Sequence, residues 1–222
     1  MTNYIFKENG KSELQIGKLV CLARTYKKHA KEMNTNVTED PLLFIKPASS
    51  VIFDGDSIAI PKISNCLHHE VELGVVIRRK CKNVSQKSAM DYVLGYVLAL
   101  DITARDIQFE AKKNGWPWGI AKGFDTFAPI SKVVLRDEVK YPNNLDLSLM
   151  VNGEIKQKSN TKNMIYSVER IIEFISNIMT LESGDLIMTG TPEGVGEIKN
   201  GDVLEAKLGQ VCSLKIDVKS LN

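Results

Sequence analysis

Two glutamates occupy alternate positions in a strongly apolar segment of the chain. In HHEVELGVV (residues 68–76), valine and leucine alternate with them in the manner of a buried strand. Alternate residues of a strand share a face, so Glu70 and Glu72 are expected to point the same way. Two ionised carboxylates side by side repel each other. Their face is therefore exposed to solvent, neutralised by a lysine or arginine, or occupied by a divalent cation.

A third carboxylate ends another apolar segment. Asp101 closes YVLGYVLALD (residues 92–101), and polar groups at strand ends commonly point into a site. With Glu70 and Glu72 it would form a face of three carboxylates that leaves positions open for water and substrate. Oxygen ligands of this kind suit Mg²⁺, Mn²⁺ or Ca²⁺. The third carboxylate favours the metal interpretation over solvent exposure.

The adjoining histidines do not extend this set of ligands. The chain has neither an HExxH helix nor a spaced pair of histidines. By alternation His69 points away from the two glutamates, so we assign it to packing or to support of the ligands. His68 either supports the ligands or lies at the surface.

A sheet must position these carboxylates, and short strand-like segments dominate the chain. Residues 18–23, 42–47 and 69–77 are apolar and short, whereas residues 24–33 are typical of a helix. Residues 89–101 are expected to change from helix to strand near Gly95. These segments fit an α+β fold with a mixed β-sheet or β-roll better than regular βαβ alternation.

Three local signals mark turns and a helix. The pair Asn152-Gly153 predicts a hairpin, and Asp54-Gly55 predicts a turn between two β-forming segments. Residues 167–185 predict a helix that Ser167 caps and Gly184 follows. Its apolar stripe consists of Ile171, Ile172, Ile175 and Ile178.

Composition bounds the class of protein. The chain has 222 residues, of which 43% are hydrophobic and 25% charged, with a net charge of +2 spread along its length. This composition predicts one globular domain, or one domain plus a short appendage, and it lacks the basic footprint of a nucleic-acid binder. No apolar segment reaches the roughly 20 residues of a membrane span, and no secretory signal is evident. The four cysteines lie far apart without a CxxC pair, which predicts reduced thiols and a cytoplasmic location, or a mitochondrial one in a eukaryotic source.

Several separate motifs resemble the fumarylacetoacetate hydrolase family. These are LHHEVELGVV, AMDYVLGYVLALDITARD, NGWPWGIAKGFDT, MIYSVERIIEFIS and TLESGDLIMTGTPEGVG, in an order and spacing that match its small single-domain acylpyruvase and oxaloacetate decarboxylase members. The resemblance runs from about Lys18 to the end of the chain. It implies a β-roll fold of the type found in the family's C-terminal domain, a homodimer, and Mg²⁺ or Mn²⁺ as cofactor. We therefore expect a catalytic domain over residues 17–222, preceded by an N-terminal appendage of residues 1–16.

The resemblance also assigns roles to individual residues. It implies that the metal ligands are Glu70, Glu72 and Asp101, that the catalytic residues are His29, Glu32 and Lys122, and that the substrate-binding residues include Gln108 and Thr191. One departure is visible, because small members usually have GRNYxxH where this chain has ARTYKKH (residues 23–29). The change affects the fit of the substrate and the hinge of a mobile helix that closes the site, rather than the metal ligands.

Physical arguments accompany some of these roles. His29 and Glu32 stand at i and i+3 of a predicted helix, so they form either a solvated surface pair or a dyad in which the imidazole accepts a proton from water. Lys122 is either a surface lysine or an ammonium that offsets the charge of an enolate or carboxylate. Arg24 is a second candidate for that work, or else forms a structural salt bridge.

Three further assignments concern the neighbouring motifs. We interpret Arg105 and Asp106 as structural. TGTPEGVG (residues 189–196) lacks the ending of a phosphate-binding loop, so its glycines allow a tight turn beside the ligand. There, Thr191 would offer its hydroxyl or its N–H to a substrate carboxylate.

The expected reaction is metal-dependent cleavage of a C–C bond next to a 2-oxo acid. Acylpyruvate hydrolysis and oxaloacetate decarboxylation both proceed through an enolate that a Lewis acid stabilises. Two alternatives stay open: an isomerase or decarboxylase of an unsaturated dioic acid, and a metal-binding scaffold without turnover. The expected partner is a small 2-oxo acid, with no nucleic acid and no membrane.

Overall fold

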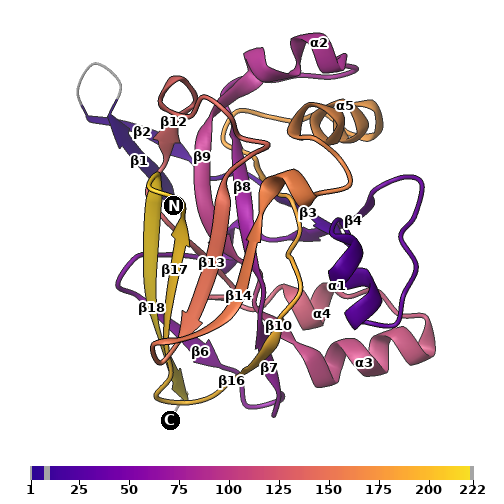
Figure 1. The fold of residues 1–222 in the computed structure, drawn as a ribbon, viewed down its shortest axis with the longest axis vertical. Coiled ribbons are helices and arrows are strands. Elements are labelled where there is room, and N and C mark those ends of the chain that lie inside the picture. Colours follow the sequence, from indigo (N-terminus) through magenta and orange to yellow (C-terminus); the bar gives the residue numbers. More distant parts are fainter. Residues whose placement is uncertain (1, 8–10, 221–222) are drawn as a thin grey trace.

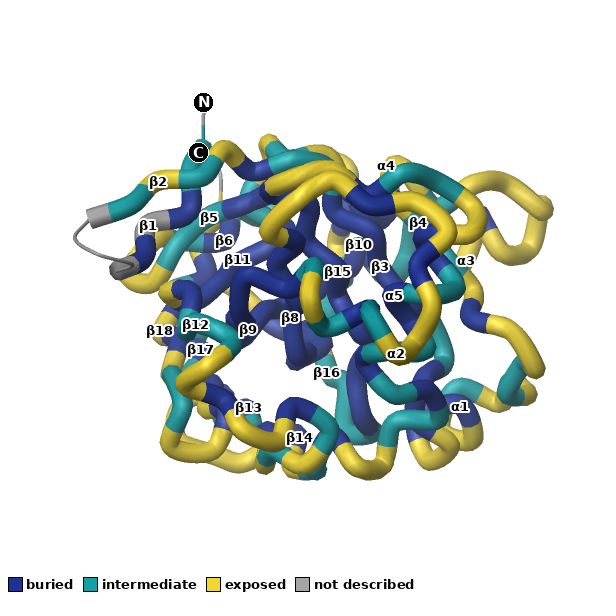
Figure 2. Tube along the Cα trace, turned by 90° about the horizontal axis from the view of Figure 1, so that it is seen from above, coloured by how far each residue is buried: buried dark blue, intermediate teal, exposed yellow. Residues whose placement is uncertain are grey.

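The largest sheet of the protein runs through its centre. The structure is a computed structural model that describes residues 2–7 and 11–220. The sheet has eight strands in the order β4-β3-β15-β8-β9-β11-β5, with β12 also paired to β9. Its strands are β3 (Leu19–Ala23), β4 (Leu42–Lys46), β5 (Val51–Phe53), β8 (Val71–Ile77), β9 (Val93–Leu100), β11 (Ala128–Ile130), β12 (Val134–Leu135) and β15 (Leu186–Met188). Every residue of β8 and β9 is buried, and Figure 2 shows these two strands among the dark-blue segments inside the molecule.

A second sheet packs against the first. It has five strands in the order β14-β13-β17-β18-β6. These are β6 (Ser57–Ile60), β13 (Asp146–Val151), β14 (Glu154–Asn160), β17 (Val203–Leu208) and β18 (Cys212–Ser220). Leu73 and Leu98 of the large sheet share one buried cluster with Leu149 and Ala206 of the second, so the main core lies between the two sheets.

Helices and a small sheet gather at the end of β8 and β9 where the carboxylates lie. The small sheet has the order β10-β7-β16, with β7 (Leu67–His69), β10 (Thr103–Ala104) and β16 (Gly196–Ile198). In Figure 1, α1 (Lys27–Glu32), α3 (Arg105–Asn114) and α4 (Gly119–Lys122) lie at this end, and α2 (Gln86–Ala89) and α5 (Val168–Ile178) at the other. None of the helices in the described part of the chain is long and apolar enough to cross a membrane.

The α+β prediction is confirmed, and the large sheet is mixed because β15 pairs parallel to β3 and antiparallel to β8. The hairpin at Asn152-Gly153 is also confirmed. Strands β13 and β14 are antiparallel, and both turn residues have positive φ, 52° and 80°. Left-handed backbone at both positions is the conformation that an Asn-Gly pair adopts at low cost.

The predicted end of the helix that begins after Ser167 is wrong. Helix α5 begins after its cap, where the Ser167 hydroxyl accepts from the N–H of Arg170, but it ends at Ile178 instead of continuing toward Gly184. Leu181 then bridges to Cys81, so tertiary pairing ends the helix. Ile178 is 54% exposed and does not belong to the buried stripe.

The helix-to-strand change near Gly95 is also misplaced, because β9 begins at Val93. Gly95 lies inside the strand, where a Cβ would stand 2.2 Å from the carbonyl oxygen of Val134. The Asp54-Gly55 turn exists, but it joins β5 and β6, which belong to different sheets. It therefore redirects the chain between layers and closes no hairpin.

The N-terminal residues form a two-stranded hairpin, β1 (Asn3–Lys7) with β2 (Lys11–Gln15). Tyr4 is 1% exposed and belongs to a second buried cluster with Leu19, Val97 and Leu186. The hairpin thus covers the face of the large sheet opposite the second sheet. A domain boundary at residues 16 and 17 stays a prediction.

Candidate metal centre and active-site cavity

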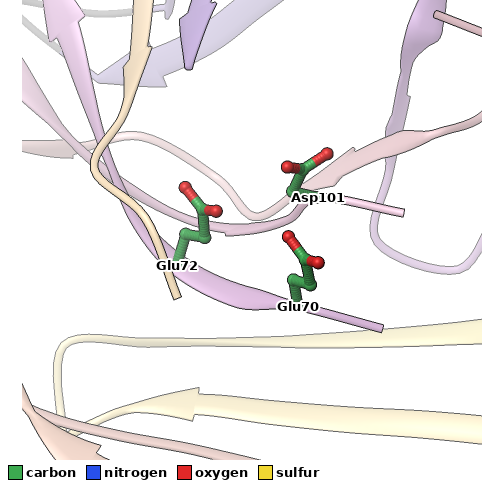
Figure 3. Close-up of side chains that lie close together, drawn as sticks. All are labelled: Glu70, Glu72 and Asp101. Atoms are coloured by element: carbon green, nitrogen blue, oxygen red, sulfur yellow. The ribbon is translucent and has the colours of Figure 1, made fainter. Parts of the chain in front are cut away.

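Strand pairing brings the three carboxylates together. Glu70 lies between β7 and β8, Glu72 lies on β8, and Asp101 directly follows β9. The two strands are antiparallel, and the N–H of Asp101 donates to the carbonyl oxygen of Glu70 over 2.8 Å. One oxygen from each side chain lies within 4.8 Å of the others, and all three residues are buried. Figure 3 shows the carboxylates directed into one region from the two strands.

Cations neutralise two of these carboxylates. Lys122 Nζ lies 3.0 Å from Glu70 and 2.5 Å from Asp101, and Lys46 Nζ lies 2.5 Å from the other oxygen of Asp101. Arg105 pairs with Glu70. Both lysines are buried, at 0% and 2% exposure, so these pairs are shielded from solvent.

Among the described residues, no cation forms an ion pair with the third carboxylate. Within the described part of the chain, Glu72 accepts a hydrogen bond only from the N–H of Gly190, over 2.7 Å. Burial, followed by the charges of Asp101 and Glu70, raises the pKa of Glu72 well above its usual value. Burial also raises the pKa of Glu70, but Lys122 and Arg105 outweigh that effect and hold it well below its usual value.

This arrangement fits a hard divalent cation. The donors are all carboxylate oxygens, which suit Mg²⁺ and Mn²⁺. The buried, uncompensated charge of Glu72 is the feature that a cation would relieve. Glu70, Glu72 and Asp101 are therefore the residues that would hold it.

A cavity that is open to solvent lies beside this cluster. Six residues assigned from the sequence line it: Arg24, His29, Glu70, Gln108, Lys122 and Thr191. Its apolar wall includes Phe44 and Trp118, whose rings meet edge to face with centroids 5.8 Å apart. The structure thus brings together residues from α1, α3, α4 and the loop after β15.

His29 and Glu32 form the expected contact on α1. His29 Nδ1 lies 3.1 Å from Glu32 Oε2, and the N–H of Gly194 donates to Glu32 Oε1 over 3.0 Å. Because an ionised carboxylate only accepts, the neutral form of this imidazole carries its hydrogen on Nδ1 and keeps a lone pair on Nε2. No residue in the described ranges bonds to Nε2, and His29 lines the cavity, so the imidazole has the tautomer that a general base requires.

The hydroxyl of Thr191 is already engaged. It donates to the carbonyl oxygen of Val71 over 2.9 Å and accepts from Gln157 Nε2 over 2.9 Å. A hydroxyl has one hydrogen to donate, so of the two groups predicted for a substrate carboxylate, only the N–H of Thr191 remains.

Sequence reasoning missed three residues of this region. Arg105 was interpreted as structural, yet it pairs with Glu70, donates to Gln108 Oε1 over 2.6 Å and lines the cavity. Lys46 lies within an apolar strand, and that unusual position was the available signal. Gln157 had no signal, because it lies on a strand of the second sheet, remote in sequence from the residues it contacts.

His69 and Asp106 behave as packing residues. His69 is 1% exposed and its Nδ1 lies 3.0 Å from Gln157 Oε1, which also accepts from the N–H of Val71. The carboxylate of Asp106 accepts from the Ser64 hydroxyl and the Asn65 N–H, so its structural interpretation agrees with its contacts.

Comparison with known proteins agrees with this geometry. The family described as "Fumarylacetoacetate (FAA) hydrolase C-terminal" matches residues 18–219. An "Oxaloacetate decarboxylase, mitochondrial" from Dictyostelium discoideum is 51% identical over 203 residues, covering 90% of this chain and 93% of the relative. An "Oxaloacetate tautomerase FAHD1, mitochondrial" from Bos taurus is 45% identical over 201 residues, covering 90% and 91%.

Solved structures give the same answer for the fold. A fumarylpyruvate hydrolase from Pseudomonas aeruginosa, solved in complex with Mn²⁺ and pyruvate, superimposes with a TM-score of 0.93 at 31% identity. The match covers 99% of this chain and 96% of that one. The convergence of the three carboxylates, the mixed-sheet architecture and these matches lead to one conclusion: the chain belongs to the fumarylacetoacetate hydrolase family.

Proposed function

We propose that this protein is a Mg²⁺- or Mn²⁺-dependent enzyme that cleaves a C–C bond next to a 2-oxo acid. The reactions are hydrolysis of acylpyruvates, decarboxylation of oxaloacetate, or both, through a common enolate. The observation that carries the proposal is the buried cluster of Glu70, Glu72 and Asp101 beside a cavity lined with basic side chains.

The charges of the site support an anionic substrate. When all are ionised, the three carboxylates balance Lys46, Lys122 and Arg105. A divalent cation would leave the buried site with an excess of positive charge, which a 2-oxo acid carboxylate offsets. When bound, the cation supplies Lewis-acid stabilisation of the enolate oxygen.

Other groups of the chain divide the remaining work. Lys122 is held as an ammonium, because Asp101 and Glu70 outweigh the burial that would lower its pKa. It is placed to stabilise negative charge that develops on the substrate. Arg24, Gln108 and the N–H of Thr191 hold the substrate in place. His29, oriented by Glu32, accepts a proton from the water that attacks the distal carbonyl of an acylpyruvate.

Decarboxylation needs no nucleophile, so the same site can catalyse the loss of CO₂ from oxaloacetate without His29. Keto–enol tautomerisation of oxaloacetate also passes through an enolate, that of oxaloacetate itself rather than that of pyruvate. The reactions of the relatives named as a decarboxylase, a tautomerase and a hydrolase therefore all need a stabilised enolate at the 2-oxo carbon, and this supports tautomerase activity as a second candidate.

Steady-state turnover on a panel of 2-oxo acids, with and without Mg²⁺ or Mn²⁺, tests the proposal. His29→Ala should lower acylpyruvate hydrolysis by about 10²- to 10⁴-fold and affect decarboxylation less. Lys31→Ala on the same helix is the matched control and should keep the wild-type rate. Hydrolysis at the wild-type rate by His29→Ala would contradict the dyad. Binding of Mg²⁺ and oxalate without turnover of any keto acid would favour the scaffold alternative, and turnover confined to an unsaturated dioate would favour the isomerase.

Assembly and location complete the proposal. We expect a homodimer, which sedimentation at micromolar concentration would detect as twice the chain mass. We expect a cytoplasmic location, or a mitochondrial one in a eukaryotic source. The mitochondrial relatives from Dictyostelium discoideum and Bos taurus support the second case.

A further inference from the structure

Two basic side chains at the cavity have no acidic partner. Arg24 and Lys112 both line the cavity, and neither side chain makes an ion pair or a hydrogen bond with any of the described residues. The other two cations of the lining differ, because Arg105 and Lys122 are committed to Glu70. The cavity therefore has an inner pair of neutralised cations and an outer pair of free ones.

Helix α3 carries one residue of the inner pair and one residue of the outer pair. Arg105, Gln108 and Lys112 follow one another at i+3 and i+4 spacing, so they lie along one face of the helix. The rise from Arg105 to Lys112 is about 10 Å at 1.5 Å per residue. Arg105 is at the carboxylate cluster, so Lys112 is displaced from that cluster along the cavity.

An aromatic wall runs along the same route. Lys122 Nζ lies 4.9 Å from the centroid of the Phe44 ring, and the Phe44 ring meets that of Trp118. Lys112 Nζ lies 5.4 Å from the centroid of Trp118. Lys112 thus rests on an aromatic face that orients its ammonium without neutralising it.

The backbone conformation of Arg24 and the positive charge of Lys112 are both energetically unfavourable. Arg24 has a φ of 61°, a left-handed conformation that side-chain-bearing residues adopt at some cost and that is often found at functional sites. Lys112 belongs to the exposed residues but is not fully solvated, and partial burial, followed by the charges of Arg105 and Arg24, lowers its pKa. An anion between Arg24 and Lys112 would relieve this repulsion.

We propose that Lys112, with Arg24, binds a second carboxylate at the far end of the substrate. The preferred substrates are then acylpyruvates whose acyl group ends in a carboxylate, rather than those that end in a methyl group. The 2-oxo acid end lies at Glu70, Glu72 and Asp101, and the chain of the substrate lies along Phe44 and Trp118. This assignment rests on the proposed function and names a specificity residue for it.

A matched pair of substrates tests the assignment. Succinylpyruvate and butyrylpyruvate have the same seven-carbon chain and differ only in a terminal carboxylate or methyl group. The wild type should have the higher kcat/KM for succinylpyruvate. Lys112→Met should lower the ratio of the two kcat/KM values by roughly ten- to a hundredfold, mainly through the KM for succinylpyruvate, because a hydrogen bond to a charged group is lost.

Neighbouring variants serve as controls. Lys113→Met removes an exposed lysine that does not line the cavity, and it should keep the wild-type ratio. Lys112→Arg should retain most of the preference. Arg24→Gly removes the guanidinium while relieving the left-handed backbone, and it should also lower the ratio.

The outcomes separate this assignment from the proposed function. If the enzyme turns over both compounds and Lys112→Met keeps the wild-type ratio, the carboxylate subsite is wrong and the proposed function stands. If the wild type turns over neither compound, its assignment as an acylpyruvate hydrolase fails, and if oxaloacetate is not turned over either, the whole proposed function fails. Calorimetric titration of succinylpyruvate and butyrylpyruvate in Mg²⁺ then tests the subsite alone. Tighter binding of succinylpyruvate by at least about tenfold, lost in Lys112→Met, would support it; equal affinities would overturn it.

Discussion

The carboxylate cluster and the outer part of the cavity differ in how firmly their side chains are held. Glu70 and Asp101 each contact two cations inside the protein. Arg24 and Lys112 contact no charged partner among the described residues, and Lys112 is exposed. A group held by several buried partners keeps its position when a substrate enters, whereas a free cation can adapt to the substrate's far end. Under the proposals above, the firmly held inner region would set the chemistry and the outer region would select the substrate.

Enzymatic activity should be almost abolished when one carboxylate of the inner region loses its charge. Glu72→Gln should lower activity by at least about a thousandfold, because the cation loses a ligand and its stabilisation of transition-state charge. Metal-free Glu72→Gln should be as stable as the wild type or more so, since it removes a buried charge that has no cation partner. Thermal unfolding with Mg²⁺ and with EDTA checks this, with Glu197→Gln at an exposed position of β16 as the control. Full activity of Glu72→Gln would refute the metal site.

A second substitution in the inner region should lower the stability of the protein. Lys46→Met should lower the free energy of unfolding by about 3 kcal/mol or more, because it leaves a buried carboxylate of Asp101 without one of its two cations. Urea unfolding in EDTA measures the effect. Lys207→Met, at an exposed position of β17, should change stability by less than about 0.5 kcal/mol. Equal stabilities of the two variants would mean that the Lys46 pair is not needed.

A third substitution tests Gln157, which supports the site from the second sheet. Gln157→Leu should cost about 2 kcal/mol of stability, because His69, the N–H of Val71 and the Thr191 hydroxyl lose their common partner. We also expect about a tenfold lower kcat, since β8 and the loop at Thr191 lose a shared anchor. Gln157→Glu keeps the acceptor for His69 and Val71, so it should recover part of kcat. A loss of stability with unchanged kcat would make Gln157 structural only.

The smallest effect concerns pH. Burial, followed by the charge of Arg105, lowers the pKa of His68 from 6.5 to about 4. As the pH falls, the unfolded chain binds this proton first, so stability is complete above about pH 6.5 and is lost toward about pH 4. We expect His68 to account for about 1–2 kcal/mol of that loss, because its side chain is partly exposed. The free energy of unfolding of His68→Asn should depend less steeply on pH over the same range. A pH dependence equal to that of the wild type would contradict the assignment.

Much of the local structure could be predicted from the sequence. Asn152-Gly153 and Ser167 act through backbone conformation and a nearest-neighbour hydrogen bond, so no distant contact is needed to recognise them. The common direction of Glu70 and Glu72 follows in the same way from strand alternation. The end of α5 was missed because pairing of Leu181 with Cys81, remote in the chain, overrides helix propensity.

The sequence by itself determined which groups are present for chemistry: acidic pairs on alternating strand positions, a histidine and glutamate one helical turn apart, and the motifs that identify the family. Only the tertiary structure decided their charge state and direction. It placed Lys46 and Arg105 against two carboxylates, gave Glu72 no ion pair with a cation of residues 2–7 and 11–220, and occupied the hydroxyl of Thr191. The physical reason is that burial and ion pairing depend on distances across separate strands, which strand periodicity does not encode.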